Sequence, residues 1–240
     1  MDMDRMMTYS WVMFDADNTL FDFDLAEQQA LVKAFAQQRL PFKDEYSQLY
    51  HRINADIWSE FEQGRISSVQ LRVERFTRLF RAAGLSVDAQ GFSQVYLVFL
   101  AQGAQLIPGA QEMIQTLLRA GLRLALVTNG LRDVQRPRLE ASLIAGCFEV
   151  IVVSEEVGSP KPEAGFFEAA FAMMGSPAKP AVLLVGDSLS SDIQGGHAFG
   201  LDTCWYSPAG RPADPRFPAT FTISSLEQIP AIVCSGSCEP

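Results

Sequence analysis

The sequence predicts an α/β fold, in which a parallel sheet is interrupted after its first strand by a helical domain. Two observations lead to this prediction. Short, continuously apolar runs alternate with helical patterns from about residue 108 onward, and a long stretch without strand signals separates the first apolar run from the others. Strands that are apolar along their whole length are typical of parallel sheets covered by helices on both faces.

The first strand is predicted at residues 9–14, where apolar and aromatic residues follow one another. Residues 24–105 are predicted to be helical, because apolar residues recur there at helical spacing, as in residues 76–83. Breaks between these helices are expected at Pro41, Gly64 and Gly84. The following helices are predicted at residues 108–121, 132–143, 163–174 and 191–199. The strands that alternate with them are predicted at residues 122–127, 149–153, 181–185 and 202–206.

Composition limits the classes of partner. The 240 residues carry a net charge of -9, which repels nucleic acid polymers, and no apolar stretch approaches the roughly 20 residues that span a bilayer. Residues 1–14 lack the apolar segment of a signal peptide. The cysteines at 147, 204, 234 and 238 have no zinc-site spacing, so we expect free thiols and a cytoplasmic location.

Four short polar segments each follow a predicted strand. They are Asp15-Ala16-Asp17-Asn18-Thr19, Thr128-Asn129-Gly130, Lys161-Pro162, and Gly186-Asp187-Ser188 with Asp192. Ligands of open parallel sheets bind beyond the carboxyl ends of the strands, so we expect these side chains to meet. Each segment alone is explained as a turn, a helix cap or a surface charge, but their joint placement favours a site.

The residue types in these segments suit a phosphate ester and a magnesium ion. Clustered carboxylates repel one another unless a cation neutralises them, and Mg²⁺ prefers oxygen ligands. Lys161 supplies a positive charge for a phosphoryl oxygen. Thr128, with the amides of Asn129 and Gly130, offers hydrogen bonds at a helix N-terminus. A calcium loop counted from Asp15 is disfavoured, because its sixth position is not glycine.

The first segment also contains a nucleophile and a proton donor. An aspartate at a strand end, such as Asp15, can attack phosphorus and form an acyl phosphate. A second carboxylate two residues later, Asp17, can protonate the leaving oxygen and then activate water.

These segments resemble the four signature motifs of the haloacid dehalogenase-like hydrolases, and the resemblance extends from about residue 9 to residue 233. It implies a Rossmann-like catalytic core at 8–21 and 105–233, a helical cap at 22–104, and a disordered tail at 234–240. By the same resemblance Asp15 is the nucleophile and Asp17 the general acid and base. The presence of Asp17 favours a phosphatase, because dehalogenases of the family lack a carboxylate there.

The resemblance also implies the ligands of the ion and of the phosphoryl group. Mg²⁺ is expected on Asp15, on the backbone carbonyl of Asp17 and on Asp187. Asp192 is expected to support the ion through water or to orient the lysine. Thr128 and Lys161 are expected to bind the phosphoryl group.

A finer resemblance is to the bacterial pyrimidine 5'-nucleotidases. It is carried by residues 14–23, 58–66 and 153–158, and by Thr203-Cys204-Trp205. It implies hydrolysis of UMP, dUMP and dTMP. In the helical stretch, Trp58 is a candidate for stacking on the base and Asn54 for reading its edge.

Two alternatives remain from the sequence. One is a phosphatase of a small metabolite such as phosphoglycolate or a sugar phosphate. The other is a regulatory module that accepts a phosphoryl group without turnover, although such modules are about half this length and lack an inserted helical domain. The expected partner is a small phosphate ester, and the expected assembly is a monomer or a homodimer.

Overall fold

The computed structural model describes residues 9–212 and 214–233 of the chain. It divides into two compact units. Among the described residues the sheet unit comprises 9–21, 106–130, 142–212 and 214–233, and the helical unit comprises 22–105 and 131–141. The predicted tail, residues 234–240, lies outside the described residues. The roles of the two units as catalytic core and cap stay a prediction.

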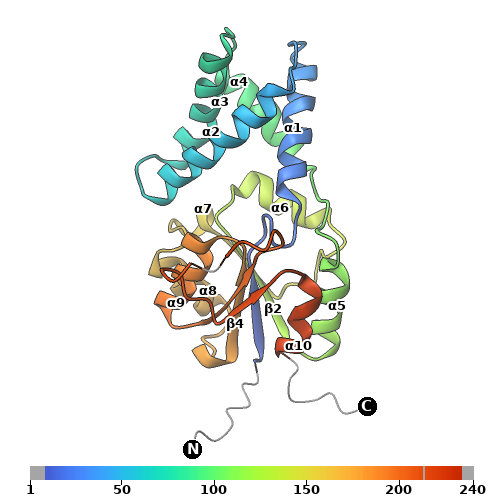
Figure 1. The fold of residues 1–240 in the computed structure, drawn as a ribbon, viewed down its shortest axis with the longest axis vertical. Helices are drawn as coiled ribbons and strands as arrows, with labels where there is room; N and C mark the ends of the chain where they lie inside the picture. Colours follow the sequence, from blue (N-terminus) through green and yellow to red (C-terminus); the bar gives the residue numbers. More distant parts are fainter. Residues whose placement is uncertain (1–8, 213, 234–240) are drawn as a thin grey trace, which may run out of the picture. The chain divides into compact units, whose positions relative to one another are not determined.

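Within the described residues, six parallel strands form the sheet, in the order β3-β2-β1-β4-β5-β6 (Figure 1). Their bounds are β1 Trp11–Phe14, β2 Arg123–Thr128, β3 Val150–Val153, β4 Val182–Gly186, β5 Asp202–Tyr206 and β6 Phe221–Ile223. Strand β1 lies between β2 and β4, with Phe14 opposite Leu126 and Val185. This register brings the carboxyl ends of the three strands to one edge of the sheet.

Helices cover both faces of the sheet, which explains why its strands are apolar throughout. The helices of this unit are α5 Ala110–Arg119, α7 Ser154–Val157, α8 Ala164–Met173, α9 Gln194–Phe199 and α10 Ile229–Val233. Helices α5 and α10 lie on one side of the sheet, and α8 and α9 on the other (Figure 1). On the second side, Phe166 and Phe167 of α8 are buried with Trp11 and Met13 of β1.

The helical unit is built from α1 Phe23–Gln37, α2 Glu45–Glu62, α3 Ser68–Ala83, α4 Ala89–Ala101 and α6 Arg132–Glu140. Local signals start these helices. The side chains of Asp22 and Asp88 accept hydrogen bonds from first-turn amides of α1 and α4, and Ser67 forms a capping box with Gln70 at α3. Helix α3 ends at Gly84, whose φ of 66° is in the left-handed region that glycine adopts without strain.

Aromatic rings fill the centre of the helical unit. The ring of Phe76 lies 5.0 Å from those of Phe92 and Tyr96, and it stacks on Tyr50 at 5.3 Å, measured between centroids. Phe35 of α1 contacts Phe92 at 5.1 Å. Edge-to-face and stacked pairs at these distances add to the stabilisation that comes from burial. The unit therefore has a hydrophobic core of its own.

The predicted fold class is confirmed: a parallel sheet with flanking helices is joined to a helical insertion after the first strand. The structure adds the edge strand β6, which the sequence analysis missed because it has only three residues and pairs with β5 alone. Helix α6 ends at Glu140, three residues before its predicted end. The predicted helix at 191–199 begins instead as the π-helical turn Leu189–Ile193, which continues into α9.

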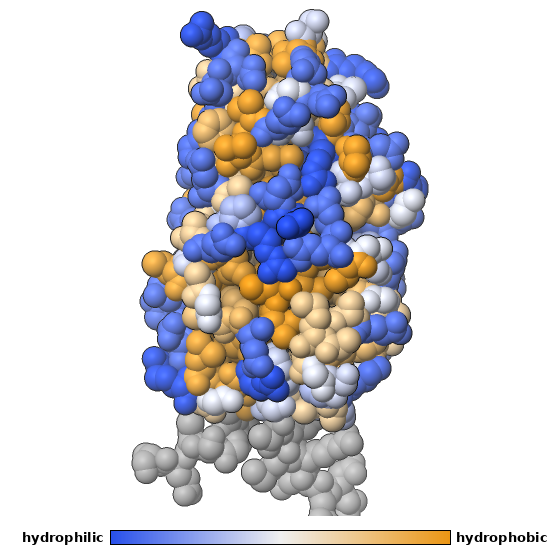
Figure 2. Space-filling model, turned by 180° about the vertical axis from the view of Figure 1, so that it is seen from behind, coloured by the Kyte–Doolittle hydropathy of each residue, from blue (hydrophilic) through white to orange (hydrophobic). Residues whose placement is uncertain are grey.

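The surface is mixed in character. Figure 2 shows hydrophilic and hydrophobic residues interspersed over the face that it draws. Large exposed hydrophobic side chains among the described residues are Val32, Val69, Val98, Leu143 and Met173. In the described part of the chain, every helix is too short or too polar to cross a membrane.

The aromatic core makes a prediction for stability. Phe76→Ala should lower the free energy of unfolding by roughly 3–5 kcal/mol, because it removes a fully buried ring and leaves a cavity. Urea denaturation followed by circular dichroism measures this. Val69→Ala on the same helix is the control; Val69 is 71% exposed, so a change within about 0.5 kcal/mol is expected. Equal losses in the two variants would contradict the assigned core.

Candidate active site

The candidate active site begins with the tight turn that follows β1. The backbone N–H of Asp15 donates to the carbonyl of Val185 at 2.9 Å, which continues the pairing of β1 with β4. The amides of Leu20 and Phe21 then both donate to the carbonyl of Ala16 at 2.9 Å. These bonds close the turn directly beyond Asp15. They hold its side chain, which is 7% exposed, at the carboxyl end of the central strand.

Lys161 connects the segments of the site. Its Nζ donates to Asp15 Oδ1 at 2.6 Å, to Asp192 Oδ1 at 2.7 Å and to the carbonyl of Val127 at 3.0 Å. An ammonium group has three protons to donate, and these acceptors account for all of them. The lysine is 1% exposed, so the ion pairs are shielded from water. The structure therefore brings Lys161 into contact with Asp15 and Asp192, as the sequence predicted.

The loop that carries Lys161 is attached to the end of β2. Asn129 Nδ2 donates to the carbonyl of Lys161 at 2.9 Å, and the amide of Lys161 donates to Asn129 Oδ1 at 2.7 Å. The buried hydroxyl of Thr128 accepts the amide of Gly130 at 3.1 Å. The side chain of Asn129 thus serves to position the lysine, a role that the sequence analysis did not assign.

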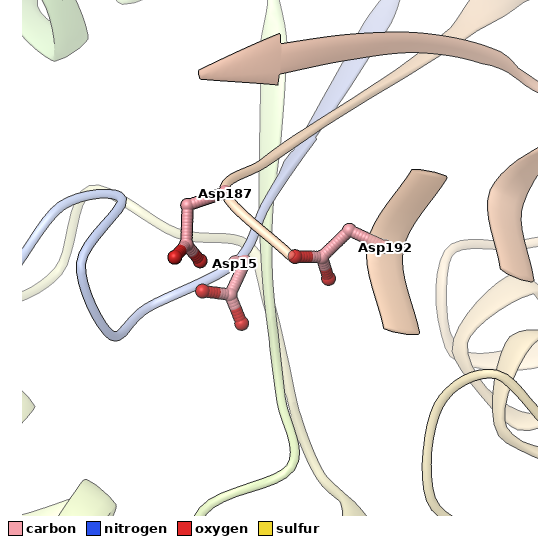
Figure 3. Close-up of side chains that lie close together, drawn as sticks. All are labelled: Asp15, Asp187 and Asp192. Atoms are coloured by element: carbon pink, nitrogen blue, oxygen red, sulfur yellow. The ribbon is translucent and has the colours of Figure 1, made fainter. Parts of the chain in front are cut away.

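Asp187 and Asp192 follow β4. One carboxylate oxygen from each of Asp15, Asp187 and Asp192 lies within 4.8 Å of the other two, and the three side chains lie side by side (Figure 3). The amide of Ser188 donates to Asp192 Oδ2 at 3.1 Å. The close approach of Asp192 to β4 requires glycine at 186, because a Cβ there would lie 2.3 Å from Asp192 Cγ.

Burial and mutual repulsion shape the electrostatics of these carboxylates. Burial, together with the charges of Asp192 and Asp17, raises the pKa of Asp15 to about 7, although Lys161 opposes the rise. Burial, with the charges of Asp15 and Asp192, raises the pKa of Asp187 well above its ordinary value. Burial lowers the pKa of Lys161, but the carboxylates of Asp15 and Asp192 outweigh it, so the pKa rises and the ammonium is retained.

The residues of the cluster fit a magnesium ion. When ionised, the three carboxylates outnumber the ammonium group of Lys161, which pairs with two of them, and this leaves an excess of buried negative charge. A hard divalent cation with oxygen ligands relieves that excess. Asp15 and Asp187 are the ligands that this arrangement offers first. Both oxygens of Asp192 are already bonded, to Lys161 and to the amide of Ser188, whereas Asp15 bonds to Lys161 through Oδ1.

The two residues predicted to contact the base lie in the helical unit. Asn54 is 3% exposed; its Nδ2 donates to Glu27 Oε1 at 2.7 Å, and its Oδ1 accepts from Arg75 Nη1 at 3.3 Å. Trp58 is half-buried and meets Phe61 edge-to-face at 5.7 Å. Reading a base edge would require Asn54 to give up a bond within this buried network. The functional roles of both residues stay predictions.

Trp205 and Arg211 contact the backbone of the site, and the sequence indicated no role for them. The indole Nε1 of Trp205 donates to the backbone carbonyl of Asp187 at 3.0 Å, and Arg211 Nη2 donates to the same oxygen at 3.4 Å. The only sequence signal was the resemblance of Thr203-Cys204-Trp205 to other proteins. That resemblance marks a position without indicating its contact.

Comparisons with known proteins identify the family to which the chain is related. The family model described as haloacid dehalogenase-like hydrolase matches residues 9–200. Pyrimidine 5'-nucleotidase YjjG of Escherichia coli is 33% identical over 228 residues, which cover 95% of this chain and 99% of YjjG. Pyrimidine 5'-nucleotidase PynA of Streptococcus pneumoniae is 35% identical over 202 residues, which cover 84% of this chain and 85% of PynA.

A solved structure extends the likeness to the fold. The crystal structure of the HAD-hydrolase YfnB from Bacillus subtilis, bound to magnesium, matches this chain with a TM-score of 0.88 and 35% identity. The match covers 94% of this chain and 99% of that one. The family model spans most of the chain, and these relatives align along nearly its whole length. The resemblance predicted from the four polar segments is thus confirmed, and the chain belongs to the haloacid dehalogenase-like hydrolases.

Proposed function

We propose that the chain is a magnesium-dependent phosphomonoesterase that acts through an aspartyl-phosphate on Asp15 and hydrolyses pyrimidine nucleoside 5'-monophosphates. The observation that carries the proposal is the buried Asp15 carboxylate, which Lys161 holds at 2.6 Å beside the carboxylates of Asp187 and Asp192. The names of YjjG and PynA support the pyrimidine nucleotide as the substrate class. The cytoplasmic location and the monomer or homodimer stay predictions.

In the first step, an Asp15 oxygen attacks phosphorus and the bond from phosphorus to the ester oxygen breaks. Asp17, two residues further along the turn, gives a proton to the leaving nucleoside oxygen. Lys161 offers positive charge to the phosphoryl oxygens and keeps the Asp15 side chain in place. Asp15 and Asp187 would hold Mg²⁺, which would neutralise negative charge in the site when bound.

In the second step, Asp17 takes a proton from water. The water oxygen attacks phosphorus, and the bond between phosphorus and Asp15 breaks. Inorganic phosphate leaves and the Asp15 carboxylate is restored. Asp17 is suited to both steps, because the same side chain is a carboxylic acid in the first step and a carboxylate in the second.

Two other functions are less well supported. A regulatory module that keeps its phosphoryl group is disfavoured by membership of a hydrolase family. A phosphatase of phosphoglycolate or of a sugar phosphate uses the same chemistry, so substrate comparison has to separate it from a nucleotidase.

The nucleophile is tested by Asp15→Asn, which should lower phosphate release by at least about a thousandfold, because an amide does not form the acyl phosphate. The fold should persist, since the amide oxygen still accepts a bond from Lys161. Asp44→Asn is the matched control, because Asp44 is exposed and its side chain makes no cap hydrogen bond. Retention of a tenth of wild-type activity by Asp15→Asn would exclude this nucleophile.

The roles of Asp17 and Asp187 separate in a magnesium titration of the rate. Asp17→Asn should lower kcat strongly and leave the Mg²⁺ concentration for half-maximal rate nearly unchanged, because this side chain moves protons. Asp187→Asn should raise that concentration at least about tenfold, because it removes a ligand. If Asp17→Asn abolished metal binding while kcat at saturating Mg²⁺ was unchanged, the two roles would be wrongly assigned.

The substrate class is tested by kcat/KM for dUMP, AMP, phosphoglycolate and p-nitrophenyl phosphate. We expect dUMP to exceed AMP, because a pocket shaped for one pyrimidine ring obstructs two fused rings. Trp58→Leu should reduce kcat/KM for dUMP more than for p-nitrophenyl phosphate. Trp58 is the better first test than Asn54, whose loss also disturbs buried Glu27 and Arg75. A preference for phosphoglycolate, or for AMP over dUMP, would contradict the pyrimidine substrate and leave the proposed phosphatase chemistry unaffected.

A further inference from the structure

The peptide group between Asp187 and Ser188 is held at both of its ends. Its carbonyl oxygen accepts the indole N–H of Trp205 at 3.0 Å. Its N–H donates to Asp192 Oδ2 at 3.1 Å. This peptide joins the backbone of Asp187 to the segment that carries Asp192, so its orientation affects where both carboxylates lie.

Trp205 is suited to hold this peptide rigidly. It is 1% exposed, and it lies on β5 opposite Gly186, the residue that precedes Asp187. An indole N–H can only donate a hydrogen bond, and leaving it buried without an acceptor costs free energy. The carbonyl of Asp187 satisfies it. The position of the ring, fixed by the sheet, therefore fixes the carbonyl.

Arg211 reinforces this arrangement from the loop that follows β5. Its guanidinium lies 5.2 Å from the centroid of the Trp205 ring, and its Nη2 donates to the same Asp187 carbonyl at 3.4 Å. The backbone N–H of Arg211 donates to Ser207 Oγ at 3.1 Å, and that of Gly210 donates to the carbonyl of Ser207 at 2.9 Å. These bonds fold the loop so that Arg211 reaches back over the indole.

We propose that Trp205 is a positioning residue for the divalent cation: its indole N–H orients the Asp187 peptide, and with it the Asp187 carboxylate, toward Asp15. Arg211 acts on the same carbonyl and contributes less, because its bond is longer and it is exposed. The inference rests on the proposed use of this carboxylate cluster by Mg²⁺. Loss of groups that orient metal ligands typically weakens metal binding by about 10- to 100-fold.

The test is calorimetric titration of MgCl₂ into the full-length protein without substrate, so its readout is independent of turnover. Trp205→Phe keeps an aromatic ring in the sheet and removes the N–H donor. It should raise the Kd for Mg²⁺ about tenfold or more. With Mg²⁺ at saturation, kcat should stay within about threefold of wild type, because the reacting groups are unchanged. Arg211→Ala should raise the Kd by a smaller factor.

Trp11→Phe is the matched control. Trp11 is equally buried at 1% exposure, but it begins β1 at the opposite end of the strands from the site. It should lose comparable thermal stability and keep the wild-type Kd. Equal Kd values in wild type and Trp205→Phe would overturn the positioning role, as would equal losses of affinity in the two tryptophan variants. If Trp205→Phe does not fold, an unchanged Kd in Arg211→Ala overturns the inference and a raised Kd supports it.

The same titration separates this inference from the proposed function. Failure of the wild-type protein to bind Mg²⁺ would remove the metal from the proposed function and overturn the positioning role with it. Binding by wild type that Asp187→Asn weakens and Trp205→Phe does not would overturn the positioning role alone. Absence of phosphatase activity in a protein that binds Mg²⁺ would leave the role of Trp205 intact.

Discussion

The ion pairing of the buried Lys161 ammonium is the interaction on which the candidate active site depends. A charge removed from water is tolerated only when it is paired and its hydrogen bonds are satisfied. Lys161 meets that condition through Asp15, Asp192 and the carbonyl of Val127, which belong to segments far apart in the sequence. The chain therefore has to bring these segments together before the lysine can be buried.

The parallel sheet makes that assembly possible. Strand β1 is central: the chain continues to β2 and β3 on one side of it and then crosses to β4 on the other, so the region beyond the carboxyl ends of β1, β2 and β4 is a topological switch point. Val127 lies on β2, Asp15 follows β1, and Asp192 lies beyond β4. Gly186 completes the geometry, because any side chain there would occupy the place of Asp192. The fold thus supplies the positions, and short polar segments supply the chemistry.

The sequence predicted those features that depend on local pattern and missed those that depend on contacts. Apolar runs marked five of the six strands in the described residues, and the residues after them marked Asp15, Lys161 and Asp187. Strand β6 is too short to produce a pattern. The bonds of Asn54 to Glu27 and Arg75 join three helices, and Trp205 donates to a backbone carbonyl, which any residue at position 187 would offer. Neither contact produces a recognisable pattern in the local sequence.

Two buried carboxylates, one in each unit, differ in the charged groups that surround them. Glu27 bonds to the neutral amide of Asn54 and to His51, and Arg75 donates to the oxygen of the same Asn54 side chain. Asp15 has the ammonium of Lys161, but two further carboxylates, Asp187 and Asp192, surround the same point. When its carboxylates are ionised, the second cluster carries an excess of negative charge, which a further cation would neutralise. Because the chain as a whole carries a charge of -9, it does not attract an anionic substrate by its global field. A site that is completed by a cation attracts that substrate locally, which is the electrostatic condition for a phosphatase on an acidic protein.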